Sequence, residues 1–322
     1  MSMEKDSISK EEFRDILIER LKETYTEDQF EIEKVEINKN NGVKLHGIKV
    51  NEKGKRVAPT VYIDEAYEAY INDDASLQEI IVSFNRGIDN GFENMPEEVQ
   101  SSGDVFENYD FVKERSFVRI VGIENNDEYL EGLVKRDFLN MAIIPYILLG
   151  DEEEPCASHA CVVVREEHLK HWNVDKDEYI DLAINNTARN LCYKPMLDIL
   201  IKMMGNRNPE LIEELEEERE NGFSSNMFVI STKNMFYGAS AMIFSEFLDE
   251  CMKKEAYDKM VIIPSSVHEI IAIMFDDDTI SPDDMKQMIS EVNHTSVEAT
   301  EVLSYTPYYK ELGKAIKYYN EF

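Results

Sequence analysis

The sequence predicts an α+β fold, in which a small N-terminal unit of a β-hairpin and helices precedes a larger, mixed α+β C-terminal unit. Three observations predict it. The apolar period changes repeatedly between 3.6 and two, helices and short strand groups are mixed rather than strictly alternating, and residues 87–103 are rich in Gly, Asn and Glu. At about 150 residues per domain, 322 residues suffice for two domains. We therefore expect an N-terminal unit over 1–95 and a C-terminal unit over 104–322.

The expected N-terminal unit begins with a helix that Ser9 caps, because Glu12 follows three residues later as in a capping box. Three strands are expected next, over residues 30–37, 43–50 and 59–63. Residues 38–42 form the turn between the first two strands, since Asn and Gly tolerate positive φ. Two helices follow, and Ser76 with Glu79 caps the second of them.

The expected C-terminal unit mixes both kinds of element. Its strands are expected over residues 117–123, 137–149, 160–164, 227–231, 260–263 and 267–275. Its helices are expected over 168–172, 175–191, 195–205, 210–220 and 239–253, and from 281 onwards. A tight turn at 264–266 makes the last two strands neighbours. The acidic helix 210–220 is interpreted as a solvated face. The aromatic residues from Tyr305 onwards indicate either a docking surface or a strand and helix packed on the body.

Composition excludes several classes of function. With 34 basic and 66 acidic side chains, the formal charge is −32. This charge argues against a nucleic-acid partner, because neutralising phosphates needs a basic surface, and against docking on an anionic membrane. No apolar run spans a bilayer, no secretory signal opens the sequence, and four cysteines are too few for a disulfide framework. We expect a soluble, cytoplasmic, acidic protein.

The familiar cofactor motifs are missing from the sequence. No two glycines stand two positions apart, which excludes the Gly-x-Gly-x-x-Gly dinucleotide fingerprint. The pair Gly87 and Gly91 has the spacing of a nucleophile elbow but carries Asp89 in place of the serine. No Cys-x-x-Cys and no His-Glu-x-x-His occurs. We therefore expect no cofactor.

One cluster of residues has ligands that suit zinc. Thiolates and imidazoles are supplied by Cys156, His159, Cys161, His168 and His171. The spacing matches no common zinc module, and Cys161 begins an apolar strand, where a free cysteine packs as a small hydrophobe. Ordinary packing is therefore the favoured interpretation, with a metal site built on Cys156, His159 and Cys161 as the alternative.

The segment 264–269 is the most polar stretch beside a buried strand. Ser265, Ser266, His268 and Glu269 offer a nucleophile, a base and an orienting acid in one place. If the segment is extended, however, His268 and Glu269 point to opposite faces and form no direct dyad. The alternatives are a binding site without catalysis, and a strand-end turn whose hydroxyls satisfy backbone groups.

Several segments together resemble a known family. They are residues 40–47, 58–62, 136–142, 168–172, 186–187, 237–239 and 264–269. Through them the chain resembles, over nearly its full length, a domain-of-unknown-function family of uncharacterised proteins from clostridia-type gut bacteria. The resemblance carries no activity. Within its segments, the polar and aromatic residues that we take as candidate ligand-binding residues are Asn186, Thr187, His168 and Trp172.

The function that the sequence favours is binding. We expect a cytoplasmic, non-catalytic binding or accessory protein that acts on another protein or a small ligand. The alternative is a hydrolase that uses Ser265 or Ser266 with His268 and Glu269.

Overall fold

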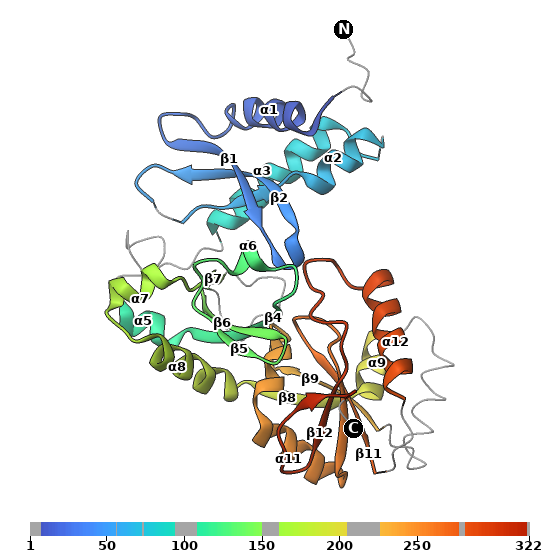
Figure 1. The fold of residues 1–322 in the computed structure, drawn as a ribbon. Helices are drawn as coiled ribbons and strands as arrows, with labels where there is room; N and C mark the ends of the chain where they lie inside the picture. The colour runs from blue at the N-terminus through green and yellow to red at the C-terminus, as the bar shows by residue number, and fades with distance from the viewer. Residues whose placement is uncertain are drawn as a thin grey trace. The chain divides into compact units, whose positions relative to one another are not determined.

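The computed structural model describes residues 8–55, 57–72, 74–93, 108–149, 161–204, 226–276 and 281–320 (Figure 1). The chain divides into two compact units, Met1–Val112 (unit 1) and Lys113–Phe322 (unit 2). Helices accompany antiparallel sheets in both units, which confirms the predicted α+β class. Over the described ranges, every helix is too short or too polar to span a bilayer.

Unit 1 combines a three-stranded antiparallel sheet, in the order β1-β2-β3, with helices. Its elements are α1 (Lys10–Leu21), β1 (Phe30–Asn38), η2 (Asn40–Gly42), β2 (Lys44–Glu52), β3 (Thr60–Tyr62), α2 (Asp64–Ile71) and α3 (Leu77–Glu93). The predicted capping box is confirmed, because the Ser9 and Glu12 backbone N–H groups each donate to the other residue's side chain. The predicted turn is also confirmed, since Asn41 adopts a φ of 61° between the two long strands.

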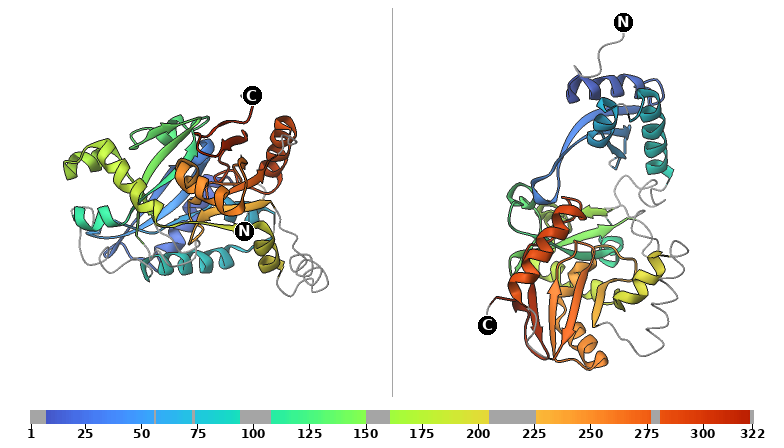
Figure 2. Two further views of the ribbon diagram at one scale, coloured as in Figure 1. Left: turned by 90° about the horizontal axis from the view of Figure 1, so that it is seen from below. Right: turned by 90° about the vertical axis from the view of Figure 1, so that its right-hand side faces the viewer.

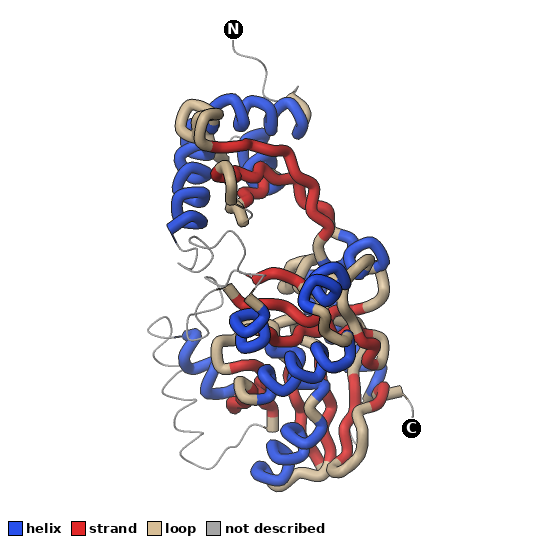
Figure 3. Tube along the Cα trace, turned by 90° about the vertical axis from the view of Figure 1, so that its left-hand side faces the viewer, coloured by secondary structure: helices blue, strands red, loops and turns tan. Residues whose placement is uncertain are grey.

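In unit 1 the helices lie against the sheet (Figure 3), and apolar side chains from both form one core. Phe13 and Leu17 of α1 meet Ile48 of β2 and Phe84 and Ile88 of α3. Residues four apart share one helix face, so each helix contributes one apolar stripe. Burying each such side chain contributes about 1.5–3 kcal/mol, and this shared core joins the hairpin to the helices.

Unit 2 contains two antiparallel sheets. In the four-stranded sheet, β6 (Met141–Leu148) pairs with β4 (Ser116–Gly122), β5 (Arg136–Phe138) and β7 (Cys161–Val163). The helices α5 (Tyr109–Glu114), α6 (Asp127–Leu130), α7 (Glu166–Trp172) and α8 (Lys176–Ala188) neighbour these strands in sequence. The predicted strand over 137–149 is divided in two, because Leu139 takes a φ of 54° and turns the chain between β5 and β6.

The six-stranded sheet has the order β13-β12-β10-β11-β9-β8. Figure 2 shows its orange and red strands lying side by side. Its strands are β8 (Leu191–Pro195), β9 (Met227–Thr232), β10 (Lys259–Ile263), β11 (Ile270–Phe275), β12 (Tyr308–Glu311) and β13 (Lys317–Tyr318). Its helices are α9 (Met196–Met204), η5 (Gly238–Ile243), α11 (Ser245–Glu255) and α12 (Pro282–Thr295). The predicted pairing of β10 with β11 is confirmed. On one face, Ile289 of α12 packs against Val261 and Tyr309.

Three further predictions in unit 2 are wrong. The sequence pattern misses β8, because it assigns Pro195 to the start of the following helix. β8 is an edge strand, where proline is tolerated, and Pro195 is its last residue. The expected helix over 239–253 is a 3₁₀ turn followed by α11. The strand expected from 267 begins only at Ile270, because the Val267 N–H donates to the carbonyl of Glu301 instead of to the neighbouring strand. The expected acidic helix over 210–220 lies outside the described residues.

Candidate functional site

The loop 264–269 connects β10 to β11 and brings a histidine against an aromatic side chain. The imidazole of His268 stacks on the ring of Tyr237, with centroids 5.3 Å apart and planes within 7°. Its Nδ1 accepts the backbone N–H of Tyr237 at 3.2 Å. Its Nε2 lies 3.4 Å from Oε1 of Glu301. These contacts define a neutral tautomer, because a nitrogen that accepts an N–H carries no proton and the other nitrogen then donates to the carboxylate.

Tyr237 holds an unusual backbone conformation. Its φ is 52°, in the left-handed region that residues other than glycine seldom adopt. Such residues persist where surrounding contacts hold them, and they cluster at functional sites. Here the hydrogen bond to His268 is one such contact. The phenol hydroxyl then accepts a hydrogen bond from Nη1 of Arg119 at 2.6 Å.

Arg119 is a buried charge on β4. Only 7% of its surface is exposed, and its guanidinium lies over two phenol rings, 4.7 Å from the centroid of Tyr237 and 5.6 Å from that of Tyr129. Burial raises the pKa of Tyr237 to about 12, so its hydroxyl is neutral near pH 7 and brings no counter-charge to the arginine.

Arg119 has no anionic partner within the described ranges. No carboxylate oxygen of the described residues lies within 4 Å of a guanidinium nitrogen of Arg119. Its buried Nε also has no hydrogen-bond partner. A buried charge is costly unless it is paired and hydrogen-bonded. We call Arg119, Tyr129, Tyr237, His268 and Glu301 the Arg119 cluster.

The electrostatics of His268 agree with its tautomer. Burial lowers the pKa of His268, and the repulsion from Arg119 acts in the same direction. The carboxylates of Glu301 and Glu269 act against this shift without reversing it. The ring is therefore mostly neutral near pH 7.

The predicted catalytic serines lie in the same loop but face other groups. The Ser266 hydroxyl accepts the backbone N–H of His268 at 3.0 Å, which is a local turn bond. The Ser265 hydroxyl donates to the Glu269 carboxylate at 3.3 Å. The structure thus brings Ser265 and Glu269 together. The hydrogen bonds described for the two serine hydroxyls join a carboxylate and a backbone N–H, not the imidazole of His268. Catalysis by these residues stays a prediction.

Asn186 and Thr187 of α8 join this helix to the start of β4. The Asn186 amide donates to the carbonyls of Lys113 at 2.8 Å and Ser116 at 2.9 Å. The Thr187 hydroxyl is buried, accepts the Val118 N–H and donates to the Ala183 carbonyl. These contacts give Asn186 and Thr187 a structural role at the start of β4. The role of the two residues in ligand binding stays a prediction.

Replacing Asn186 with alanine is therefore expected to lower the free energy of unfolding of unit 2 by about 1–3 kcal/mol, because two carbonyls lose their donor. Urea denaturation measures the change. A variant Asn186→Asp, which keeps the shape and loses the donors, should be destabilised at least as much. Full stability in both variants would contradict this anchoring role.

His168 and Trp172 lie on α7. The Nδ1 of His168 accepts the N–H of Arg165 at 3.2 Å, and burial lowers its pKa. The Trp172 ring lies 5.6 Å from that of His168 and stacks on Tyr179 at 5.5 Å, between centroids. The two candidates thus share one aromatic row that joins α7 to α8, and their role as ligand-binding residues stays a prediction.

The candidate metal residues are only partly described. Cys156 and His159 lie outside the described residues, while Cys161 is a half-buried cysteine on β7. Among the residues that the structure does describe, no three His, Cys, Asp or Glu side chains are grouped for a metal ion. The metal alternative therefore stays a prediction.

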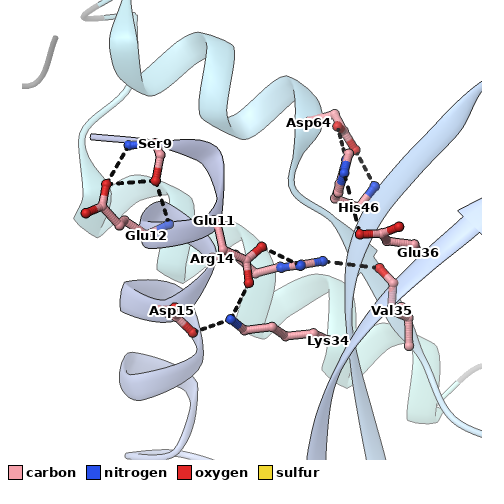
Figure 4. A network of polar contacts seen from close by, with 10 residues as sticks. All are labelled: Ser9, Glu11, Glu12, Arg14, Asp15, Lys34, Val35, Glu36, His46 and Asp64. Carbon is pink, nitrogen blue, oxygen red and sulfur yellow. Dashed lines mark hydrogen bonds and ion pairs between the residues drawn. The ribbon is translucent and has the colours of Figure 1, made fainter. Parts of the chain in front are cut away.

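A second polar network lies in unit 1, where the side chains of α1, the hairpin and α2 meet (Figure 4). Asp64 accepts both the backbone N–H of His46 at 2.8 Å and a hydrogen bond from Nδ1 of its ring at 3.0 Å. The Lys10 ammonium pairs with the same carboxylate at 2.9 Å. Hydrogen bonds from Lys10 and His46 hold the pKa of Asp64 below its usual value, against its burial. This network joins β2 to the first turn of α2.

Sequence reasoning missed Arg119, Tyr237 and Glu301 as members of one site. Arg119 did carry a signal, because it is the one charged residue in the otherwise apolar strand 116–122. Tyr237 lies in one of the segments that resemble the family, but nothing in the sequence linked it to His268. Glu301 carried no signal, since only the fold brings it to His268.

Comparisons with known proteins identify a family and no individual relative. Neither the curated proteins nor the solved structures contain a match to this chain. A family model, described as "Family of unknown function (DUF5688)", matches residues 10–310. This match spans most of the 322 residues. The chain therefore belongs to the DUF5688 family.

Proposed function

We propose that this protein is a non-catalytic binding protein that holds the anionic group of a small ligand at Arg119. The observation that carries the proposal is a guanidinium with 7% exposure and no carboxylate partner among the described residues. An anion supplies the opposite charge, and anions that can accept two parallel hydrogen bonds, such as carboxylate, sulfate and phosphate, match the guanidinium best.

The surroundings of Arg119 support a binding role. The Tyr129 and Tyr237 rings and the Tyr237 hydroxyl hold the guanidinium in place, and fixing a binding group in advance reduces the entropy lost on association. The proposal places the protein in the cytoplasm, in keeping with free thiols at Cys192 and Cys251. It includes neither nucleic acid nor membrane as a partner, because the formal charge is −32.

The test is isothermal titration calorimetry, in which sulfate, phosphate or acetate is added to the protein at constant ionic strength. Arg119→Met should weaken binding at least about tenfold, because a hydrogen bond to a charged group contributes about 1.5–3 kcal/mol. It should leave stability unchanged or higher, since an uncompensated buried charge is removed. The matched control is Arg136→Met, which removes an equal charge from β5, where Asp177 and Asp181 already pair it.

Two results would overturn the proposal. One is binding that falls equally in both variants, which would indicate general attraction by net charge. The other is a lack of measurable binding to all three anions in the wild-type protein.

A second candidate is the hydrolase, which one observation favours. The Ser265 hydroxyl donates to the Glu269 carboxylate at 3.3 Å, so a serine and an acid are in contact. Against it, Nδ1 of His268 already accepts the Tyr237 N–H, and a serine is activated by an adjacent general base, of which histidine is the commonest. Hydrolysis assays with generic ester, peptide and phosphate substrates distinguish the two functions. Turnover by the wild-type protein that is lost in Ser265→Ala and in Glu269→Gln would establish the hydrolase.

A further inference from the structure

Within the Arg119 cluster, the two ring nitrogens of His268 contact different parts of the chain. One nitrogen accepts the N–H of Tyr237 at 3.2 Å, and the other lies 3.4 Å from the carboxylate of Glu301. The loop itself is fixed independently, because Ser231 donates to the His268 carbonyl at 2.7 Å and Ser266 accepts its N–H. Because the backbone of His268 is anchored, a loss of the contact between its ring and the Tyr237 N–H requires Tyr237 to move.

We infer that His268 is the positioning residue of the anion site and makes it sensitive to protons: protonation of Nδ1 removes the acceptor that keeps Tyr237 in its left-handed conformation, and the hydroxyl of Tyr237 then no longer holds Arg119. This inference rests on the proposed function for its ligand, and on geometry alone for the movement of Tyr237.

Each step follows from the contacts. The neutral ring carries its proton on Nε2, toward Glu301, so the only nitrogen that an added proton can occupy is Nδ1. A protonated Nδ1 and the Tyr237 N–H are both donors and repel each other. The left-handed conformation of Tyr237, with a φ of 52°, then loses the hydrogen bond that offsets its strain.

The charges that face the ring set the direction of the effect. Glu301 and the neighbouring Glu269 favour the imidazolium, while Arg119, across the phenol ring, disfavours it together with burial. The ring is neutral in the assembled site, so the folded form binds fewer protons than a free histidine with its pKa of about 6.5. Acidification below that value therefore favours forms in which the site is disassembled.

Sulfate is the probe, because it stays fully ionised over the whole range. Between about pH 7.5 and about pH 5.5, the affinity of the wild-type protein for sulfate should fall about tenfold. His268→Asn places a neutral oxygen acceptor near the position of Nδ1, so it should bind sulfate with the same affinity at both pH values. An affinity that is constant in the wild-type protein, or that rises with acid as simple attraction to an imidazolium requires, would overturn the inference.

Glu301→Gln is a second variant that leaves the loop intact, since this side chain is 41% exposed. Removing the carboxylate that favours the imidazolium should move the acid transition to lower pH. An unchanged midpoint would contradict the role given to His268.

Hydrogen exchange at the Tyr237 amide tests the movement without any ligand. After correction for intrinsic exchange, its protection should fall with acid in the wild-type protein and stay constant in His268→Asn. If sulfate binds at no pH while this protection changes as expected, the proposed function fails and the role of His268 stands. If the protection does not change, the role of His268 fails whatever sulfate does.

Discussion

Replacing Gly238 with alanine is expected to be among the most destabilising single changes in unit 2. A Cβ at this position would lie 2.1 Å from Oγ of Ser231 and 2.4 Å from the backbone nitrogen of Thr232. Two of the nearest atoms are backbone atoms of β9, so the clash is not relieved by a side-chain rotation. Inserting a methyl group into such a site costs about 1–3 kcal/mol and sometimes more, and we expect the upper end. Urea denaturation followed by circular dichroism measures it.

The matched control for this substitution is Gly87→Ala. Gly87 lies within α3, where an added Cβ would meet only the side chain of Val61 at 3.5 Å, an ordinary contact. Alanine there should stabilise unit 1 by about 0.5–1 kcal/mol, because glycine is a poor helix former. Equal and small effects of the two substitutions would show that Gly238 is not held against β9 as described. Gly238→Ala should also abolish sulfate binding, since Tyr237 precedes it directly.

The second large effect is expected at Asp249, the partner of a fully buried lysine. The Lys310 side chain has 0% exposure, and its ammonium contacts the Asp249 carboxylate and the carbonyls of Glu311 and Lys314. Asp249 also accepts the Gly313 N–H at 3.0 Å. These bonds fix the turn between β12 and β13 to α11. Hydrogen bonds from Lys310 and Gly313 hold the pKa of Asp249 below its usual value, against its burial.

Asp249→Asn should therefore destabilise unit 2 by about 3–5 kcal/mol, because it leaves an uncompensated buried ammonium. Lys310→Met should cost less, since the remaining Asp249 side chain is 17% exposed and is partly solvated. The double variant should recover part of the loss relative to Asp249→Asn, and a double-mutant cycle in urea measures this coupling. A strictly additive cycle would mean that the two charges do not interact.

The sequence predicted most of the fold because its elements have local causes. The capping box at Ser9, the turn at Asn41 and the β10–β11 hairpin each follow from a few neighbouring residues. The misplaced boundaries have distant causes instead. The strand expected from Val267 is shortened by a hydrogen bond to Glu301, whose position in the sequence gives no hint of this contact.

The candidate site was predictable only in part, for the same reason. His268 and its loop neighbours were recognisable as polar residues beside a buried strand. The partners that give His268 its chemistry come from three other places in the chain, namely Arg119, Tyr237 and Glu301. A single sequence carries no signal for contacts between segments so far apart, and the left-handed Tyr237 is not a glycine that would reveal its conformation.

The order of strands in the six-stranded sheet has a consequence for the time course of folding. β10 pairs with two strands, β11 and β12. A short loop connects β10 to β11, whereas β12 comes later in the chain, after α12. During synthesis the ribosome therefore releases the β10–β11 hairpin well before the segment Tyr308–Glu311. Throughout that interval the apolar strand β10 has an open edge, which is a template for pairing with another nascent chain. A pause in translation within α12 would lengthen this exposure, so slower elongation over that helix is expected to increase aggregation of the nascent chain.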